Sequence, residues 1–239
     1  MSRATTRVGC CGFPVARPKY FQRFSLVEIQ QTFYQPPRPD TVKRWREEAP
    51  PDFEFTMKAW QLITHEASSP TYRRLRIALS EKEKKQVGAF RVTDMVLRAW
   101  ETTLEIARLL HARKIIMQCP ASFTPTGENK DRMREFFARI SREGITCIWE
   151  PRGKWQNGEI VALCQELNLV HCVDPFKADS VTSDLRYYRL HGIGGYRHEY
   201  TDKELRDLAR RCSEITETYF LFNNASMHRD AERFKKILK

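Results

Sequence analysis

Lys114–Pro151, KIIMQCPASFTPTGENKDRMREFFARISREGITCIWEP, contains two β-rich runs separated by one charged segment. The runs are Lys114–Pro120 and Ile145–Pro151. Between them, Asn129–Arg142 has the apolar spacing of a helix, and Gly144 supplies a signal for the end of that helix. The stretch therefore predicts one strand–helix–strand unit of a parallel sheet.

The same alternation extends over the whole chain. Six more runs are β-rich: Val8–Phe13, Leu26–Phe33, Glu54–Ala59, Leu169–Asp174, Tyr187–Gly192 and Glu217–Asn224. Helical patterns follow most of them: Thr41–Glu48 with Asp40 as its cap, Val92–His111, Glu159–Leu167, Asp202–Arg211 and Ser226–Leu238. Eight strands alternating with helices in 239 residues predict a (β/α)8 TIM-like barrel, with residues 1–239 forming one domain.

Two connections depart from an ideal barrel. Only about a dozen residues separate the sixth and seventh predicted strands, which leaves little room for a full helix. The third connection, Trp60–Arg113, is long and predicts an extra helix around Tyr72–Gln86. A doubly wound open sheet is the alternative fold, but Gly9-Cys10-Cys11-Gly12 is not the glycine-rich phosphate turn that such a sheet carries after its first strand.

Composition narrows the class of protein. Hydrophobic residues make up 41% of the chain and charged residues 30%, a balance that argues against disorder, collagen and coiled coils. Lysine and arginine number 41 against 30 aspartates and glutamates, so the net charge is +11. Such an excess favours an anionic partner, either nucleic acid or a phosphorylated small molecule.

The cysteines and the N-terminal residues indicate the cellular compartment of the protein. The seven cysteines are odd in number and form no CxxC pair, which argues against a disulfide framework and a structural zinc site. No apolar run approaches the ~20 residues of a membrane helix. The polar start, Met1–Arg7, does not resemble a signal peptide. We therefore expect a cytoplasmic protein without membrane contact; its oligomeric state stays open.

Polar side chains interrupt the predicted strands on single faces. Alternation places Glu28, Gln30 and Thr32 on one face of the second strand, Thr56 and Lys58 on one face of the third, and Tyr187, Arg189 and His191 on one face of the seventh. The remaining strands add Gln118, Glu150 with Arg152, Asp174 and Asn223. Active sites of barrels lie at the carboxyl ends of the strands, where these groups would meet. The alternative is an internal salt-bridge network that only closes the barrel, which suits Glu28 best.

Loops supply further candidates. Thr64 and His65 follow the third strand and could fold over the mouth of the barrel. Trp155 and Tyr196 follow the fifth and seventh strands and could stack on a base or a sugar. Gly192–Gly195 could bind an anion through its amides.

These segments, taken in order, resemble the YecE-like family, a group of barrels with a domain of unknown function, DUF72. The resemblance rests on Val27–Tyr34, Trp45, Phe53–Lys58, Ile63–His65, Trp149–Arg152, Trp155, Tyr187–Gly192, Tyr196 and Phe222–Asn224. It implies a TIM-like barrel and places motif positions at Glu28, Tyr34, Lys58, Thr64, His65, Glu150, Arg152, Arg189, His191 and Asn223. This chain departs from the family at Cys10-Cys11, where a small polar pair is usual, and at Gln30, where asparagine is usual.

Three functions remain open at this point. The first is an enzyme, of hydrolase or phosphoesterase type, that acts at the mouth on a phosphate-bearing substrate, nucleic acid included. Glu150, His191, Lys58, Glu28 and His65 are its catalytic candidates. Its substrate-binding candidates are Arg152, Arg189, Tyr34, Thr64, Gln118, Asp174, Tyr196, Asn223 and Trp155.

In one form of this first hypothesis, Glu150, Asp174 and His191 bind a divalent metal ion, although the nearby lysine and arginine charges would repel it. The second function is metal-free acid–base chemistry on a small sugar or a carboxylated molecule, with Lys58, near Glu28, as a base of lowered pKa or as a Schiff-base former. The third is a non-catalytic protein that binds nucleic acid through its basic surface.

Overall fold

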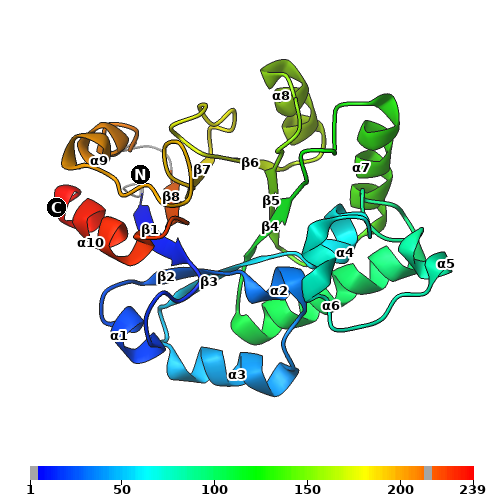
Figure 1. The fold of residues 1–239 in the computed structure, drawn as a ribbon, viewed down its shortest axis with the longest axis horizontal. Coiled ribbons are helices and arrows are strands. Elements are labelled where there is room, and N and C mark those ends of the chain that lie inside the picture. The colour runs from blue at the N-terminus through cyan, green and yellow to red at the C-terminus, as the bar shows by residue number, and fades with distance from the viewer. Residues whose placement is uncertain (1–4, 213–216) are drawn as a thin grey trace.

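The computed structural model describes residues 5–212 and 217–239. Within them, eight parallel strands close into a barrel in chain order, and β1 pairs with β8 (Figure 1). The strands are β1 (Thr6–Cys11), β2 (Leu26–Ile29), β3 (Glu54–Lys58), β4 (Lys114–Gln118), β5 (Thr146–Glu150), β6 (Val170–Val173), β7 (Leu185–Leu190) and β8 (Glu217–Phe222). The predicted TIM-like barrel is confirmed.

Helices surround the strands (Figure 1). They are α1 (Arg17–Phe21), α2 (Gln31–Tyr34), α3 (Pro39–Glu48), α4 (Gln61–Thr64), the 3₁₀ helix η1 (Pro70–Arg74), α5 (Glu81–Lys84), α6 (Asp94–Leu110), α7 (Gly127–Arg139), α8 (Asn157–Glu166), α9 (Asp202–Ala209) and α10 (Met227–Ile237). Residues 174–184, between β6 and β7, contain no helix, as their shortness predicts.

Three local predictions were wrong. The strand predicted over Leu26–Phe33 ends at Ile29, because Gln30 adopts a helical backbone conformation and leads into α2. Glu28, Gln30 and Thr32 therefore do not share one strand face. The helix predicted over Tyr72–Gln86 is divided into η1 and α5, because Ser80 forms a capping box with Glu83 and starts a new helix there.

The third error concerns the start of α3. Asp40 lies in the first turn of α3, not at its cap, because Pro39 occupies the beginning of the helix. The cap position belongs to Arg38, whose side chain makes no capping hydrogen bond.

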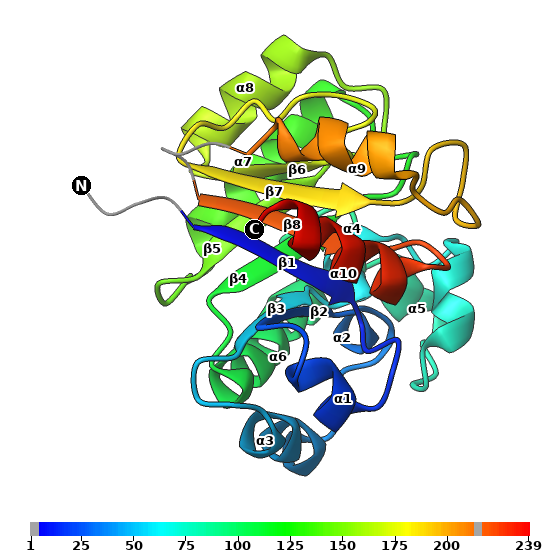
Figure 2. The same ribbon diagram turned by 90° about the vertical axis from the view of Figure 1, so that its left-hand side faces the viewer.

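The barrel interior is layered. Its middle is filled by fully buried apolar side chains, which include Leu26, Ile116, Ile148 and Leu221. Below them, toward the amino ends of the strands, the Tyr219 hydroxyl donates to Glu54 at 2.9 Å. The polar residues of interest lie above, at the carboxyl ends. Figure 2 shows the arrowheads of β1 and β7 pointing toward the side where α2, α4 and α5 lie. This side is the mouth of the barrel.

Across the described residues, none of the helices has both the length and the apolar character required to cross a bilayer. All seven cysteines are free thiols.

Candidate active site at the mouth of the barrel

Arg189, on β7, occupies the centre of the upper barrel with 1% of its side chain exposed. Its Nη1 lies 2.6 Å from Oε2 of Glu150 on β5, and its Nη2 lies 3.0 Å from Oε1 of Glu28 on β2. Gln118 and Gln30 accept further hydrogen bonds from the same guanidinium, each at 3.3 Å. The planar guanidinium of Arg189 therefore joins two carboxylates from different parts of the barrel. These three residues form the floor of the site, and their ion pairs fix its geometry.

Glu28 is a structural member of this cluster. It is fully buried and also accepts a hydrogen bond from the Tyr187 hydroxyl at 2.9 Å. Tyr187 in turn contacts the Thr56 hydroxyl at 2.8 Å. Glu28 does not line the cavity at the mouth. The position of Glu28 therefore supports the alternative given above, an internal salt-bridge network in which its carboxylate holds Arg189.

Glu150 joins the floor to the rim. Its Oε1 accepts from Nη2 of Arg152 at 2.9 Å and lies 3.7 Å from Nε2 of His191. Burial raises the pKa of Glu150, but the charges of Arg189 and Arg152 outweigh it and lower that pKa to about 2. A carboxylate this acidic and this firmly paired is a poor proton donor near neutral pH. Its surroundings oppose the acid–base role expected from the sequence and favour an anchoring role.

Lys58 lies at the base of the mouth, 4% exposed. Its Nζ donates to Oε1 of Gln118 at 2.9 Å and sits 3.7 Å from the centre of the Phe33 ring. Burial and the nearby Arg189 charge lower the pKa of Lys58 to about 7. Near neutral pH the amine is therefore present in both protonation states, as a general acid or base requires.

Thr64 and His65 lie behind the mouth rather than on its surface. Both are buried, neither lines the cavity, and the Thr64 hydroxyl contacts Nδ1 of His65 at 2.8 Å. Burial and the charge of Lys58 lower the pKa of His65 to about 3, so its ring is neutral near pH 7. Its ring packs edge-on against Phe33, the same ring that Lys58 contacts.

Trp155 has a packing position. Its ring is buried against Trp149 and Phe123, and its Nε1 donates to the Phe123 carbonyl at 2.8 Å. It does not line the mouth cavity, so this position opposes the stacking role expected for it. Tyr196, in contrast, is 57% exposed and lines the cavity, as do Tyr34 and Asn223.

Asp174 holds the histidine at the rim. Its Oδ2 accepts from the backbone N–H of His191 at 3.1 Å and lies 3.6 Å from Nδ1 of that ring. Glu150 faces the other ring nitrogen, where Nη2 of Arg152 also lies within 3.0 Å. The three candidate metal ligands therefore do not converge on one point. No group of three His, Cys, Asp or Glu side chains suited to a metal occurs within residues 5–212 and 217–239.

The cavity at the mouth has a volume of about 1170 Å³. Seven basic side chains line it and, in the described part of the chain, no carboxylate does: Arg17, Arg38, Lys58, Arg74, Arg76, Arg152 and Arg189. Four of these arginines, Arg17, Arg38, Arg74 and Arg76, were missed from the sequence. The run Arg73-Arg74-Leu75-Arg76 in the long third connection is the signal that could have suggested two of them.

Glu150 gives the first testable prediction. Its carboxylate stabilises the fold above its ordinary pKa near 4.5, and this contribution is lost as the pH falls toward about 2. Glu150→Gln should therefore lower the free energy of unfolding at pH 7 by about 3 kcal/mol and flatten its fall between about pH 4.5 and about pH 2. Urea unfolding at each pH measures both effects. Glu101→Gln, an exposed change on α6, is the control, and equal behaviour of the two variants would contradict the role of Glu150.

Comparison with known proteins identifies relatives along almost the whole chain. Residues 17–239 match the family model described as "Protein of unknown function DUF72". UPF0759 protein YunF of Bacillus subtilis strain 168 is 25% identical over 260 residues, which cover 92% of this chain and 84% of that protein. The crystal structure of a DUF72 family protein from Enterococcus faecalis V583 superimposes with a TM-score of 0.73 at 20% identity, over 99% of this chain and 98% of that one.

The barrel fold is also shared beyond these relatives. A D-psicose 3-epimerase crystallised in the presence of D-fructose superimposes with a TM-score of 0.58 at 12% identity, over 92% of this chain and 91% of the epimerase. At this identity the likeness shows the fold alone.

Proposed function

The chain belongs to the DUF72 family, and we propose that it is an enzyme that binds a phosphate-bearing small molecule in its mouth cavity and transfers a proton with Lys58. The observation that carries this proposal is the lining of that cavity, which is basic and lacks carboxylates within the described residues. A cavity walled by one sign of charge concentrates ligands of the opposite sign. Guanidinium groups are well suited to phosphate, because they donate two parallel hydrogen bonds to it.

Arg152 is the residue that we assign to the first contact with the phosphate. Its side chain is 39% exposed and lines the cavity, while Glu150 holds it in place from beneath at 2.9 Å. Arg189 is already engaged by two carboxylates, so it contributes charge and rigidity rather than a free donor fork.

Lys58 is the acid–base group of this proposal. Its amine lines the same cavity, its pKa of about 7 matches neutral pH, and Gln118 and Phe33 fix its position. The neutral amine accepts a proton from the substrate, and the ammonium form returns one. His191 stands at the rim between Asp174 and Glu150, where it can bind the substrate or exchange the proton with water.

A ligand panel read by thermal unfolding tests the binding step. Sugar phosphates and inorganic phosphate should raise Tm, whereas the corresponding free sugars should not. A ligand present at a hundred times its Kd stabilises by about 2.7 kcal/mol. The shift should vanish in Arg152→Ala and persist in Lys154→Ala, an exposed change on the same loop that does not line the cavity. An equal shift in both variants, or none from any phosphate, would contradict the proposal.

Solvent deuterium then tests the proton transfer. With a phosphate ligand that the panel identifies as substrate, NMR should show deuterium entering the molecule in wild-type protein. Lys58→Met should still bind the ligand but incorporate no deuterium. Incorporation at the wild-type rate in Lys58→Met would remove Lys58 from the chemistry.

A further inference from the structure

Three arginines on the outer wall of the mouth have no role in the proton transfer. Arg38 precedes α3, and Arg74 and Arg76 lie at and just after the end of η1. All three are exposed, and all line the cavity that Lys58 and Arg152 also line. Within the described part of the chain, none of these three arginines forms an ion pair with a carboxylate, in contrast to Arg17, Arg91, Arg108 and Arg134.

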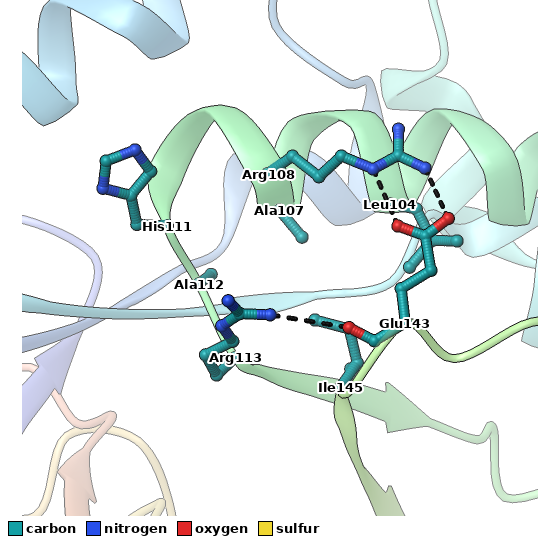
Figure 3. A pocket seen from close by; sticks show the side chains of 8 residues that line it. All are labelled: Leu104, Ala107, Arg108, His111, Ala112, Arg113, Glu143 and Ile145. Atoms are coloured by element: carbon teal, nitrogen blue, oxygen red, sulfur yellow. Dashed lines mark hydrogen bonds and ion pairs between the residues drawn. The ribbon is translucent and has the colours of Figure 1, made fainter.

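Arginines elsewhere on the surface are commonly paired. Arg108 on α6 donates to both carboxylate oxygens of Glu143, at 2.8 and 2.6 Å, beside a separate cavity of about 200 Å³ (Figure 3). Arg134 pairs in the same two-pronged way with Glu166, at 2.7 and 3.0 Å. The outer wall of the mouth therefore presents guanidinium groups whose donors are left for a ligand.

Specific contacts hold this wall in place. The Arg74 guanidinium stacks over the Tyr34 ring at 3.6 Å, and Gln61 fixes the backbone carbonyl of Tyr34 through a 2.8 Å hydrogen bond. The backbone N–H of Arg76 donates to Oε1 of Gln35 at 3.2 Å, which joins the end of η1 to the segment after α2. The arginines thus come from two separate segments that the fold brings to one wall.

We infer that the mouth contains two phosphate subsites, an inner one at Arg152 and an outer one at Arg38, Arg74 and Arg76. The substrate class is then a small molecule with two separate phosphoryl groups, such as a sugar bisphosphate. This inference rests on the proposed function, because the inner subsite is the phosphate site proposed there. A cavity of about 1170 Å³ has room for such a molecule, whereas one phosphoryl group would leave the outer arginines without a partner.

Counting bound phosphate tests the two subsites without any choice of carbon skeleton. Equilibrium dialysis with radioactive inorganic phosphate should give two ions per chain in wild-type protein and one in Arg38→Ala/Arg74→Ala. The matched control is Arg44→Ala/Arg73→Ala, which removes two exposed neighbours that do not line the cavity and should leave two ions bound.

Other numbers of bound phosphate ions would contradict the outer subsite alone or the proposed function as well. One ion in wild-type protein, retained in the outer double variant and lost in Arg152→Ala, overturns the outer subsite and leaves the proposed function standing. No bound phosphate overturns both. Binding of single-stranded oligonucleotides alone, lost in the outer double variant, overturns the small-molecule class and assigns the wall to nucleic acid.

A series of bisphosphates tests the substrate class. Isothermal titration should compare propanediol to hexanediol bisphosphates with the corresponding alkyl monophosphates. At least one bisphosphate should bind at least about tenfold more tightly than its monophosphate, because charge-assisted hydrogen bonds to a second phosphate are added. The outer double variant should abolish this difference while leaving the monophosphate affinity unchanged. Equal affinity throughout the series would overturn the inference.

Discussion

Replacing Arg189 with methionine is expected to lower the free energy of unfolding by about 3–5 kcal/mol. The substitution removes the cation between Glu28 and Glu150, which are 0% and 5% exposed, and leaves both carboxylates buried without it. Urea unfolding at pH 7 measures the loss. Arg186→Met is the matched control, since Arg186 lies on the same strand but outside the central cluster, and its guanidinium donates to the Arg211 carbonyl at 3.2 Å.

A second variant separates unpaired charge from lost packing. If buried charge causes the destabilisation, adding Glu28→Gln and Glu150→Gln to Arg189→Met should restore most of the stability, because neutral amides replace the carboxylates. A single variant as stable as wild type, or a triple variant that recovers nothing, would contradict the ion-pair account of the site floor.

Lys58 should make the protein more stable as the pH rises above 7. Its pKa is about 7 in the folded protein but near 10.4 in an unfolded chain, so between these values the unfolded chain holds one proton more. Raising the pH then favours the folded state by about 1.4 kcal/mol per pH unit, or about 4–5 kcal/mol over the whole interval. Below pH 7 both states are protonated, and the cost of burying the ammonium is fully present.

The measurement is the difference in unfolding free energy between wild type and Lys58→Met from pH 6 to pH 9. This difference should change by about 1.4 kcal/mol per unit above pH 7 and stay constant below it. Subtraction cancels the cysteines, among them Cys10 and Cys164, whose buried thiols have pKa values raised to about 12 and act in the opposite direction. Parallel curves would show that Lys58 titrates normally and would remove it as the acid–base group.

The strand-borne part of the site could be predicted from the sequence. Alternation along a strand determines which side chains point inward, so Thr56 with Lys58 and Tyr187 with Arg189 fell on the correct faces. The strand end at Ile29 could not be predicted in this way. No glycine or proline marks it, and α2 is held there by a distant contact, in which the Thr32 hydroxyl donates to the Lys58 carbonyl at 2.7 Å.

The loop-borne part depends on contacts that no local pattern encodes. Arg38 and Arg76 line one cavity, and their segments are joined where the Gln35 side chain accepts a hydrogen bond from the backbone of Arg76, 41 residues further along the chain. The role of Glu150 shows the same limit: its position was predicted, but its low pKa comes from two arginines whose distances only the folded chain sets.

The closed floor of the barrel has a consequence for the movement of ligands. Arg189 and its two carboxylates seal the upper barrel, and the apolar layer of Leu26, Ile116, Ile148 and Leu221 fills the space beneath. The described residues therefore close the cavity on the side that faces the barrel interior. For the enzyme proposed above, substrate and product would share the opening of the cavity in turn, so an abundant product would compete with substrate and product release would limit turnover.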